Sequence, residues 1–257
     1  MKFFYTCFAS LSFSMLFAQE EKQLKIAEFG RVKVYKVIED IKSFEKAYLR
    51  LDTLLMKQDS SQLMANFETR NFQLEADTKK PSNNLCANSD KGQHIHFILD
   101  NEPYTALYTG NNIFKSTPGH HVLLAFLARS YHQSLKLPNT FLVKEYTIGK
   151  AEDDFKEKKA HLFYSRPKGT YVDADTASIL IDYFLLNTVL SPKGNKVQIE
   201  LDSDIKFTVD SWTPLAVNGL NVGEHQLKLT LVDKKGLPIN SKFNGVTRKF
   251  ILANSPK

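Results

Sequence analysis

Hydrophobic and polar residues alternate along most of the chain, in short stretches separated by Ser, Asn, Gly and Pro. A period of two is typical of half-buried β-strands. The pattern predicts strands in the first half at residues 47–55, 63–74, 94–99, 121–129 and 141–148. It predicts strands in the second half at residues 178–190, 196–202, 206–210, 225–233 and 248–252. A helix over residues 44–65 would place its leucines on no single stripe, so strands are favoured there too.

An internal repeat indicates how these strands are organised. Residues 92–100 align with residues 194–202, and residues 118–123 align with residues 222–227. Two similar strands in the same order, with nearly constant spacing, predict a duplicated domain of about a hundred residues, the size of an immunoglobulin-like sandwich. Chance similarity between alternating strands is the alternative. The predicted fold class is all-β, with two tandem immunoglobulin-like β-sandwich domains after a signal peptide.

The N-terminus has the layout of a secretory signal. Met1 and Lys2 precede an uncharged, largely apolar run over residues 3–18, which is too short to span a membrane. We therefore expect a periplasmic or secreted protein without a membrane span. The expected division of the chain is a signal peptide (1–19), an N-terminal segment with a strand at 32–38 (20–43), a first, His-rich sandwich (44–150), a linker containing Tyr-Ser-Arg-Pro-Lys-Gly (151–177) and a second sandwich (178–257).

Composition narrows the choice of partners and cross-links. The 257 residues carry 34 basic and 28 acidic side chains, and this net charge of +6 is too mild to imply a nucleic-acid partner. Of the two cysteines, Cys7 lies in the predicted signal peptide, so the exported chain would keep only Cys86. An internal disulfide is then excluded, and the fold must depend on its hydrophobic core.

Four stretches carry a resemblance to a known group of proteins. They are CANSDKGQHIH (86–96), LDNEPY (99–104), ARSYH (128–132) and LFYSRPKG (162–169). With the rest of the chain from residue 44 onward, they resemble an uncharacterised family of exported Bacteroidota proteins with two immunoglobulin-like repeats, some of whose members are labelled "phosphopeptide-binding protein". The resemblance implies a cell-envelope location and no established reaction.

Histidines concentrate in the first repeat, where five of the seven fall within residues 94–132. His94 and His96 stand two apart on a predicted strand, so their side chains share a face, and the second repeat identifies it as the face directed away from the core. If the two aligned strands are antiparallel neighbours, His94 lies near His132, whereas His120 and His121 lie near Asp100. Copper or zinc could then bind to His94, His96 and His132.

Two further possibilities accompany this metal hypothesis. Cys86 could reach the same site from the preceding loop. The histidines could instead be surface or interface residues that hydrogen-bond their neighbours without any metal.

The first repeat also has an apolar outer face that the second repeat lacks. Ile98, Val122, Leu124 and Phe126 occupy positions where the second repeat has Glu200, Gln226, Lys228 and Thr230. A strand that is apolar on both faces is normally covered on both faces. We expect cover from residues 24–41, from the other domain or from a partner, and the four apolar residues form the predicted interface patch.

A second group combines cations with aromatic side chains, which suits an anion or glycan site, although an ordered linker would have the same composition. Its members are Arg129, Tyr131, Tyr164, Arg166 and Lys168. No catalytic motif accompanies them. The sequence therefore predicts a non-catalytic exported binding protein of the bacterial envelope, without a cofactor, whose partner is a protein, a peptide or a glycan. The alternative is a periplasmic copper- or zinc-binding protein.

Overall fold

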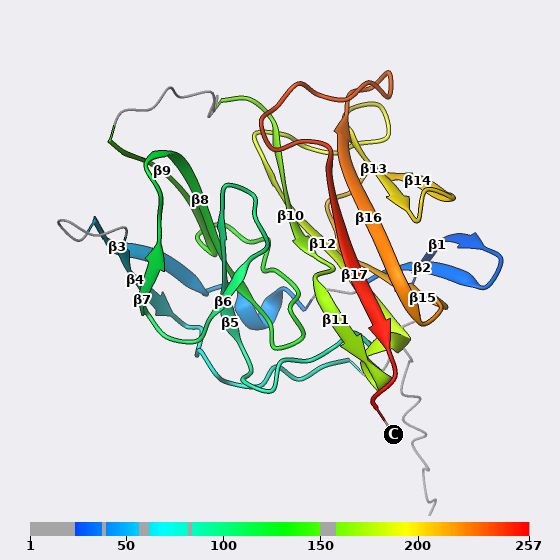
Figure 1. Cartoon of the computed structure of the whole chain (residues 1–257), viewed down its shortest axis with the longest axis horizontal. Helices are drawn as coiled ribbons and strands as arrows, with labels where there is room; N and C mark the ends of the chain where they lie inside the picture. Colours follow the sequence, from blue (N-terminus) through cyan, green and yellow to red (C-terminus); the bar gives the residue numbers. More distant parts are fainter. Residues whose placement is uncertain (1–23, 38–39, 57–61, 82–83, 150–157, 257) are drawn as a thin grey trace, which may run out of the picture.

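The structure is a computed structural model that describes residues 24–37, 40–56, 62–81, 84–149 and 158–256. The predicted signal peptide lies outside these residues. The described chain is all-β, with strands arranged as two β-sandwiches that lie side by side (Figure 1). The predicted fold class is confirmed. Two short 3-10 helices, Lys42–Phe44 and Asp173–Ala177, are the helical elements of the described part.

The first sandwich packs a three-stranded sheet on a four-stranded sheet. The three-stranded sheet has the order β3 (Tyr48–Met56), β4 (Gln62–Arg70) and β7 (Asn111–Lys115). The four-stranded sheet has the order β6 (Thr105–Leu107), β5 (His94–Leu99), β8 (Gly119–Ala128) and β9 (Phe141–Ile148). Alternate residues of β5 and β8, such as Phe97 and Ala125, face inward into the core between the sheets.

The second sandwich packs two five-stranded sheets. One has the order β1 (Leu24–Phe29), β2 (Val32–Lys36), β15 (Leu215–Asn218), β12 (Ser178–Leu186) and β10 (His161–Arg166). The other has the order β11 (Gly169–Val172), β17 (Val246–Ala253), β16 (Gly223–Val232), β13 (Lys196–Leu201) and β14 (Ile205–Val209). Their inner faces form the largest hydrophobic core of the described chain.

The structure corrects two of the predicted domain boundaries. The N-terminal segment is not a separate element, because β1 and β2 form a hairpin whose β2 pairs with β15 of the second sandwich. Val32 and Val34 are buried in that sandwich's core. Residues 161–172, expected in a linker, form β10 and β11 of the same sandwich. The second sandwich thus contains chain from before and after the first one.

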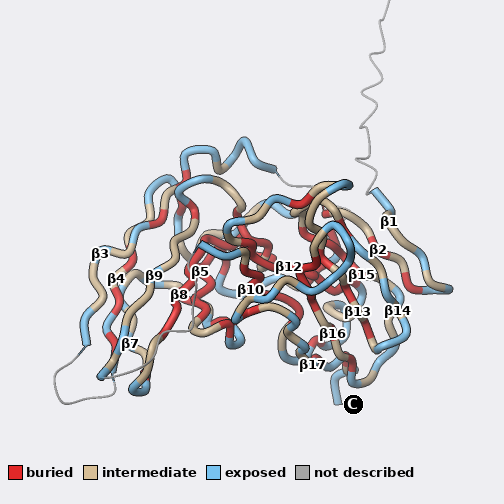
Figure 2. The backbone as a smooth tube through the Cα atoms, turned by 90° about the horizontal axis from the view of Figure 1, so that it is seen from above, coloured by how far each residue is buried: buried red, intermediate tan, exposed pale blue. Residues whose placement is uncertain are grey.

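The apolar outer face of the first repeat is covered by the second sandwich. Ile98, Val122, Leu124 and Phe126 are fully buried. They pack against an aromatic set contributed by the second sandwich, formed by Phe163, Phe184 and Phe243. Figure 2 shows buried residues gathered in the middle of the molecule, along β5 and β8 of the first sandwich and β10 and β12 of the second. The cover is intramolecular and comes from the other domain, as one alternative predicted; none of the described residues of the segment 24–41 belongs to this cluster.

The internal repeat is visible in the strand pairing. β5 pairs antiparallel with β8 in the register Leu99 to Leu123, and β13 pairs with β16 in the equivalent register Leu201 to Leu227. Each repeat also has a histidine bonded to an aspartate, since His121 Nδ1 lies 2.6 Å from the Asp100 carboxylate. The equivalent distance from His225 to Asp202 is again 2.6 Å. The duplication thus preserves turn hydrogen bonds as well as strands.

Polar contacts fix the two sandwiches against each other. Lys136, on the connection between β8 and β9, has its Nζ 2.5 Å from the fully buried Asp182 carboxylate on β12. Asn101 accepts a hydrogen bond from the backbone N–H of Tyr164, at 2.8 Å, and donates to the carbonyl oxygens of Leu162 and Phe243. Because these groups are buried and paired, the interface has a defined register.

Candidate metal centre

Three histidines meet on the face of the first sandwich that is directed toward the second. His94 and His96 project from β5, and His132 lies in the turn that follows β8. Because β5 and β8 are antiparallel and His94 pairs with Ala128, the end of β8 brings His132 beside the start of β5. His94 Nε2 lies 2.9 Å from His96 Nε2 and 3.0 Å from His132 Nδ1. One nitrogen from each ring falls within 4.8 Å of the other two.

The backbone at His132 is in the left-handed region, with φ of 65°. Its turn is closed by hydrogen bonds from the His132 and Arg129 backbone N–H groups. The second repeat has the same turn 104 residues later, and there the left-handed position is occupied by Gly236, with φ of 82°. A non-glycine residue in this region costs about 1 kcal/mol or more. The first repeat therefore holds an imidazole at a position that suits glycine.

The three imidazoles are neutral because desolvation disfavours their charged forms. His94 and His96 have no exposed surface, and His132 is half-buried. Burial lowers the pKa of His94 to about 4. Burial also holds the pKa values of His96 and His132 well below the usual range, and the positive charge of Arg166 acts in the same direction. Neutral imidazoles keep the lone pairs that a metal ion needs.

The outer nitrogens of two rings are held by hydrogen bonds. His94 Nδ1 donates to the Gly92 carbonyl oxygen at 2.8 Å, so its Nε2 carries the lone pair. His96 Nδ1 lies 3.1 Å from the hydroxyl of Ser165 on β10. Metal-ligating histidines are oriented in this way by partners on their second nitrogen. The second sandwich therefore contributes to the orientation of His96.

The three ring nitrogens that face one another are better suited to binding a cation than to hydrogen-bonding one another. The single lone pair of His94 Nε2 accepts one well-aligned hydrogen, yet two ring nitrogens lie within 3.0 Å of it. A single lone pair cannot accept a well-aligned hydrogen from both nitrogens. An ion bonded to nitrogens at about 2.0–2.1 Å in tetrahedral directions would separate them by roughly 3.3 Å. To bind copper or zinc, the two short nitrogen–nitrogen contacts would lengthen slightly, and the third separation, which lies within 4.8 Å, would adjust to the same value.

Tyr104 covers the cluster from one side. Its ring stacks on the His96 ring with centroids 3.6 Å apart and planes inclined by 7°. Its hydroxyl lies 3.4 Å from His132 Nδ1. Sequence analysis missed Tyr104 and Ser165, because both reach the cluster through packing between elements and not through strand alternation. The resemblance stretches contain both residues, but nothing in them indicates that they converge.

Two cations lie beyond the tyrosine. The Arg166 guanidinium is 5.2 Å, and the Lys168 ammonium 4.2 Å, from the centre of the Tyr104 ring. Arg166 is buried and donates to the Tyr171 hydroxyl at 2.9 Å. Lys168 donates to the Tyr104 carbonyl oxygen. Within the described residues, neither cation pairs with a carboxylate.

The predicted anion or glycan group does not form a common surface. Arg129, Tyr131, Tyr164 and Arg166 are buried, and Lys168 is half-buried. Arg129 donates to the backbone oxygen of Asp40 on another side of the first sandwich. The reason is that the stretch around Tyr164 is a central strand and not an exposed linker. Whether any of these residues contacts a ligand stays a prediction.

Cys86 does not join the histidines. Its thiol is buried 3.7 Å from the hydroxyl of Ser178, at a bridge to β12. Burial raises the pKa of this thiol to about 11, which disfavours the thiolate that would bind a metal. In the described part of the chain, the metal-ligand cluster consists of the three histidines alone.

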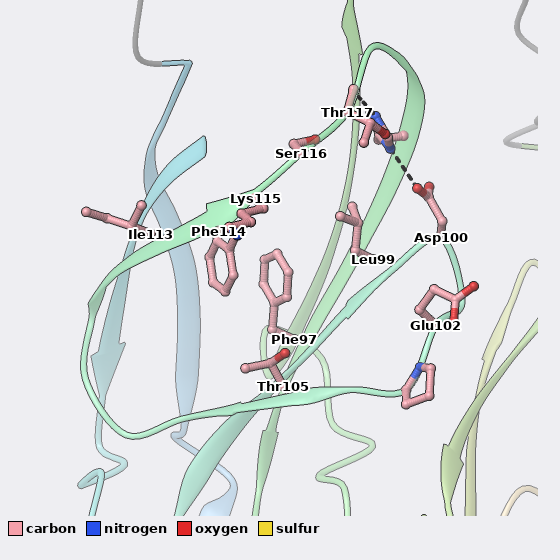
Figure 3. A pocket seen from close by; sticks show the side chains of 12 residues that line it. Phe97, Leu99, Asp100, Glu102, Thr105, Ile113, Phe114, Lys115, Ser116 and Thr117 are labelled. Carbon is pink, nitrogen blue, oxygen red and sulfur yellow. Dashed lines mark hydrogen bonds and ion pairs between the residues drawn. The ribbon is translucent and has the colours of Figure 1, made fainter. Parts of the chain in front are cut away.

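A groove opens on the opposite face of β5, between β7 and β6. It has a volume of about 480 Å³, and its floor includes Phe97 and Phe114, whose rings stack 3.8 Å apart (Figure 3). The Asp100 carboxylate and the Thr117 carbonyl oxygen bind the two nitrogens of His121 at one end. This histidine is thereby fixed in a turn of the first repeat, away from the three-histidine cluster.

Comparisons with known proteins found only distant structural similarity. No protein-family model matches the chain, and no curated protein is similar to it in sequence. The fibronectin(III)-like modules of Clostridium thermocellum CbhA are 10% identical, with a TM-score of 0.29, and the match covers 80% of this chain and 95% of that one.

Two further solved structures are also tandem domains. The two V-type regions of VCBP3, a v-region-containing chitin binding protein, are 7% identical, with a TM-score of 0.23 and coverage of 80% and 99%. The two fibronectin type-III domains of chicken tenascin are 9% identical, with a TM-score of 0.22 and coverage of 79% and 97%. At such TM-scores these likenesses carry no argument about function. In the described residues, no helix is both long and apolar enough to span a membrane.

Proposed function

We propose that this protein is an exported binding protein that holds one copper or zinc ion on His94, His96 and His132. The observation that carries the proposal is the convergence of three neutral imidazoles, two of them fully buried, in which the lone pair of His94 Nε2 faces two ring nitrogens at 2.9 and 3.0 Å. Imidazole nitrogen is a preferred ligand of both metals. The chemistry is binding, with no reaction assigned.

The second repeat supports a dedicated function for the cluster. Its residues at the three equivalent positions are Lys196, Gln198 and Gly236, none of which is a strong metal ligand. Because the two repeats share their strands, registers and turns, the fold itself does not require histidines there. The cost of the left-handed His132 backbone points the same way, since strained residues persist where a site uses them.

The test is metal binding by the native sequence, purified without a histidine tag and stripped with a chelator. Isothermal titration with copper and with zinc is expected to show one ion per chain and a raised melting temperature. The triple variant His94→Gln/His96→Gln/His132→Gln should lose both effects. The matched control His120→Gln, a substitution in the same strand pair but outside the cluster, should keep them. Equal binding by the wild type and the triple variant would refute the proposal.

Export belongs to the same proposal. It is supported by the sequence of residues 1–19 and by the resemblance of the chain to exported proteins of the bacterial envelope. Fractionation of cells that express the full chain should recover it in the periplasm or the medium. N-terminal sequencing should then begin close to residue 19. Recovery of the uncleaved chain from the cytoplasm would contradict an exported location.

A further inference from the structure

Building on the proposed metal function, we infer that the three-histidine site selects monovalent copper, Cu(I), over divalent zinc. The surroundings of the site favour a bound ion of low charge with three ligands. This preference depends on two features, the absence of a fourth ligand among the described residues and the excess positive charge near Tyr104.

The first feature follows from the stacking of Tyr104. An ion bonded to His96 Nε2 lies in the plane of that ring. The Tyr104 ring is nearly parallel to it at a centroid distance of 3.6 Å, so the phenol oxygen lies in a second plane above the ion. That separation exceeds the metal–oxygen bond length of about 2.0–2.2 Å. Tyr104 therefore caps the cluster without ligating the ion.

The described chain offers no other ligand to complete a tetrahedron. The cluster contains no carboxylate and no thiolate, and Cys86 is directed to Ser178. A zinc ion held by three histidines needs a water molecule as its fourth ligand, and structural zinc sites take a fourth ligand from the protein. Cu(I) is a d10 ion that is stable with three imidazoles. Three neutral nitrogens under an aromatic cap therefore match the requirement of Cu(I) better than that of zinc.

The second feature is electrostatic. Arg166 and Lys168 lie on the Tyr104 ring, and neither is neutralised by a carboxylate of the described residues. The Arg166 charge is felt at all three imidazoles. Coulomb repulsion is proportional to the charge of the bound ion, so a divalent ion experiences twice the penalty of a monovalent one. The three ligands are neutral and do not offset the charges of Arg166 and Lys168. These two cations therefore disfavour divalent zinc more than monovalent copper.

The experiment compares two affinities in the native protein without a tag. Cu(I) affinity is measured under argon by competition with a chromophoric Cu(I) chelator, and Zn²⁺ affinity by competition with a chromophoric zinc chelator. We expect Cu(I) to bind at least about a hundred-fold more tightly than Zn²⁺, as an order of magnitude for two nearby cations at an effective dielectric constant near 20. Zinc affinity equal to or above that of Cu(I) would overturn the inference and leave the metal function standing.

Charge-removing variants test the electrostatic cause. In Arg166→Gln and in Lys168→Gln, Cu(I) affinity should rise roughly ten-fold and Zn²⁺ affinity roughly a hundred-fold, because the divalent ion gains twice as much. Lys168 is half-buried, so its variant remains informative if Arg166→Gln fails to fold. Lys228→Gln, in the second repeat, is the control and should change neither. Equal gains for the two ions would overturn the electrostatic argument, whereas a wild-type protein that binds neither ion would refute the proposed function itself.

Discussion

His132 and Gly236 occupy the same position in the turns of the two repeats, and both have a left-handed backbone. The two turns share their closing hydrogen bonds, yet Gly236 is exposed and His132 carries a ring that reaches the nitrogens of β5. One repeat therefore keeps the residue that suits the backbone, and the other keeps the residue that completes a cluster. The fold therefore requires only a left-handed backbone at this position, whereas the three-histidine cluster requires the imidazole.

His132→Gly should separate metal binding from stability. Glycine relieves the left-handed backbone, so we expect the metal-free variant to be as stable as the wild type, or more stable by up to about 1 kcal/mol, while it loses tight copper binding. Urea unfolding and titration with copper measure the two quantities. The matched control, Gly236→His, should cost about 1 kcal/mol and bind no additional ion. A destabilised His132→Gly variant with intact metal affinity would show that the ring serves the fold.

Asp182→Asn should destabilise the interface between the sandwiches. Asp182 accepts hydrogen bonds from Lys136 Nζ and from the Ser134 backbone N–H, and its side chain is fully buried. Removal of one partner of a buried ion pair costs about 3–5 kcal/mol, because the other charge stays buried. Chemical denaturation measures this change. Glu200→Gln, at the solvent-accessible pairs with Lys206 and Lys228, should cost less than about 1 kcal/mol. Equal costs for the two variants would contradict our assignment of the buried pair.

Leu124→Ala should leave a cavity between the two sandwiches. Leu124 is fully buried in the aromatic cluster that joins them, so we expect a loss of about 2–5 kcal/mol. The equivalent residue of the second repeat is Lys228, and Lys228→Ala should stay within about 0.5 kcal/mol of the wild type. Thermal unfolding followed by circular dichroism measures both. A neutral Leu124→Ala would mean that the domain interface contributes little to stability.

Asp100→Asn and Asp202→Asn should have similar effects, since the two carboxylates have equivalent partners. Each accepts one hydrogen bond from a histidine and one from a backbone N–H. We expect each substitution to cost about 1.5–3 kcal/mol, the range for hydrogen bonds to a charged group. Metal affinity should be unchanged in both variants. A large loss of copper binding in Asp100→Asn alone would mean that the turn at His121 is coupled to the three-histidine site.

The metal-free protein should lose stability as the pH falls below about 6.5. His94 has a pKa of about 4 in the folded chain, whereas an unfolded histidine titrates near 6.5. Between these values the unfolded state binds more protons, so the free energy of unfolding decreases by up to about 1.4 kcal/mol per pH unit for this residue. Urea titrations from pH 7 to pH 4 measure the slope. The triple Gln variant should have a shallower slope, and parallel curves would contradict the buried neutral state.

Local sequence patterns predicted the elements that depend on short-range order. The boundaries of β5 and β9 agree with the alternation, and the equivalence of the two repeats correctly placed His94 near His132 and His121 near Asp100. Strand period and antiparallel pairing are sufficient for these inferences. The candidate metal ligands were therefore accessible from the sequence.

The remaining features depend on contacts between distant segments. β10 carries apolar and polar residues in a row because its two faces pack against different cores, so it shows no alternation and was assigned to a linker. Tyr104, Ser165 and the cation pair reach the histidines only after the two sandwiches have docked. The pairing of β2 with β15 joins residues about 180 positions apart, which no local pattern encodes.

That last pairing has a consequence for biosynthesis. The β1–β2 hairpin leaves the ribosome before the first sandwich, but β15, the strand that it must pair with, is made only after residue 214. The first sandwich has all its strands by residue 148 and can form early, whereas the hairpin has to wait with an unpaired edge. Completion of the fold is therefore the slow, late event, because a long loop must close before β2 and β15 pair. Truncation before residue 215 would consequently leave the N-terminal hairpin without its partner.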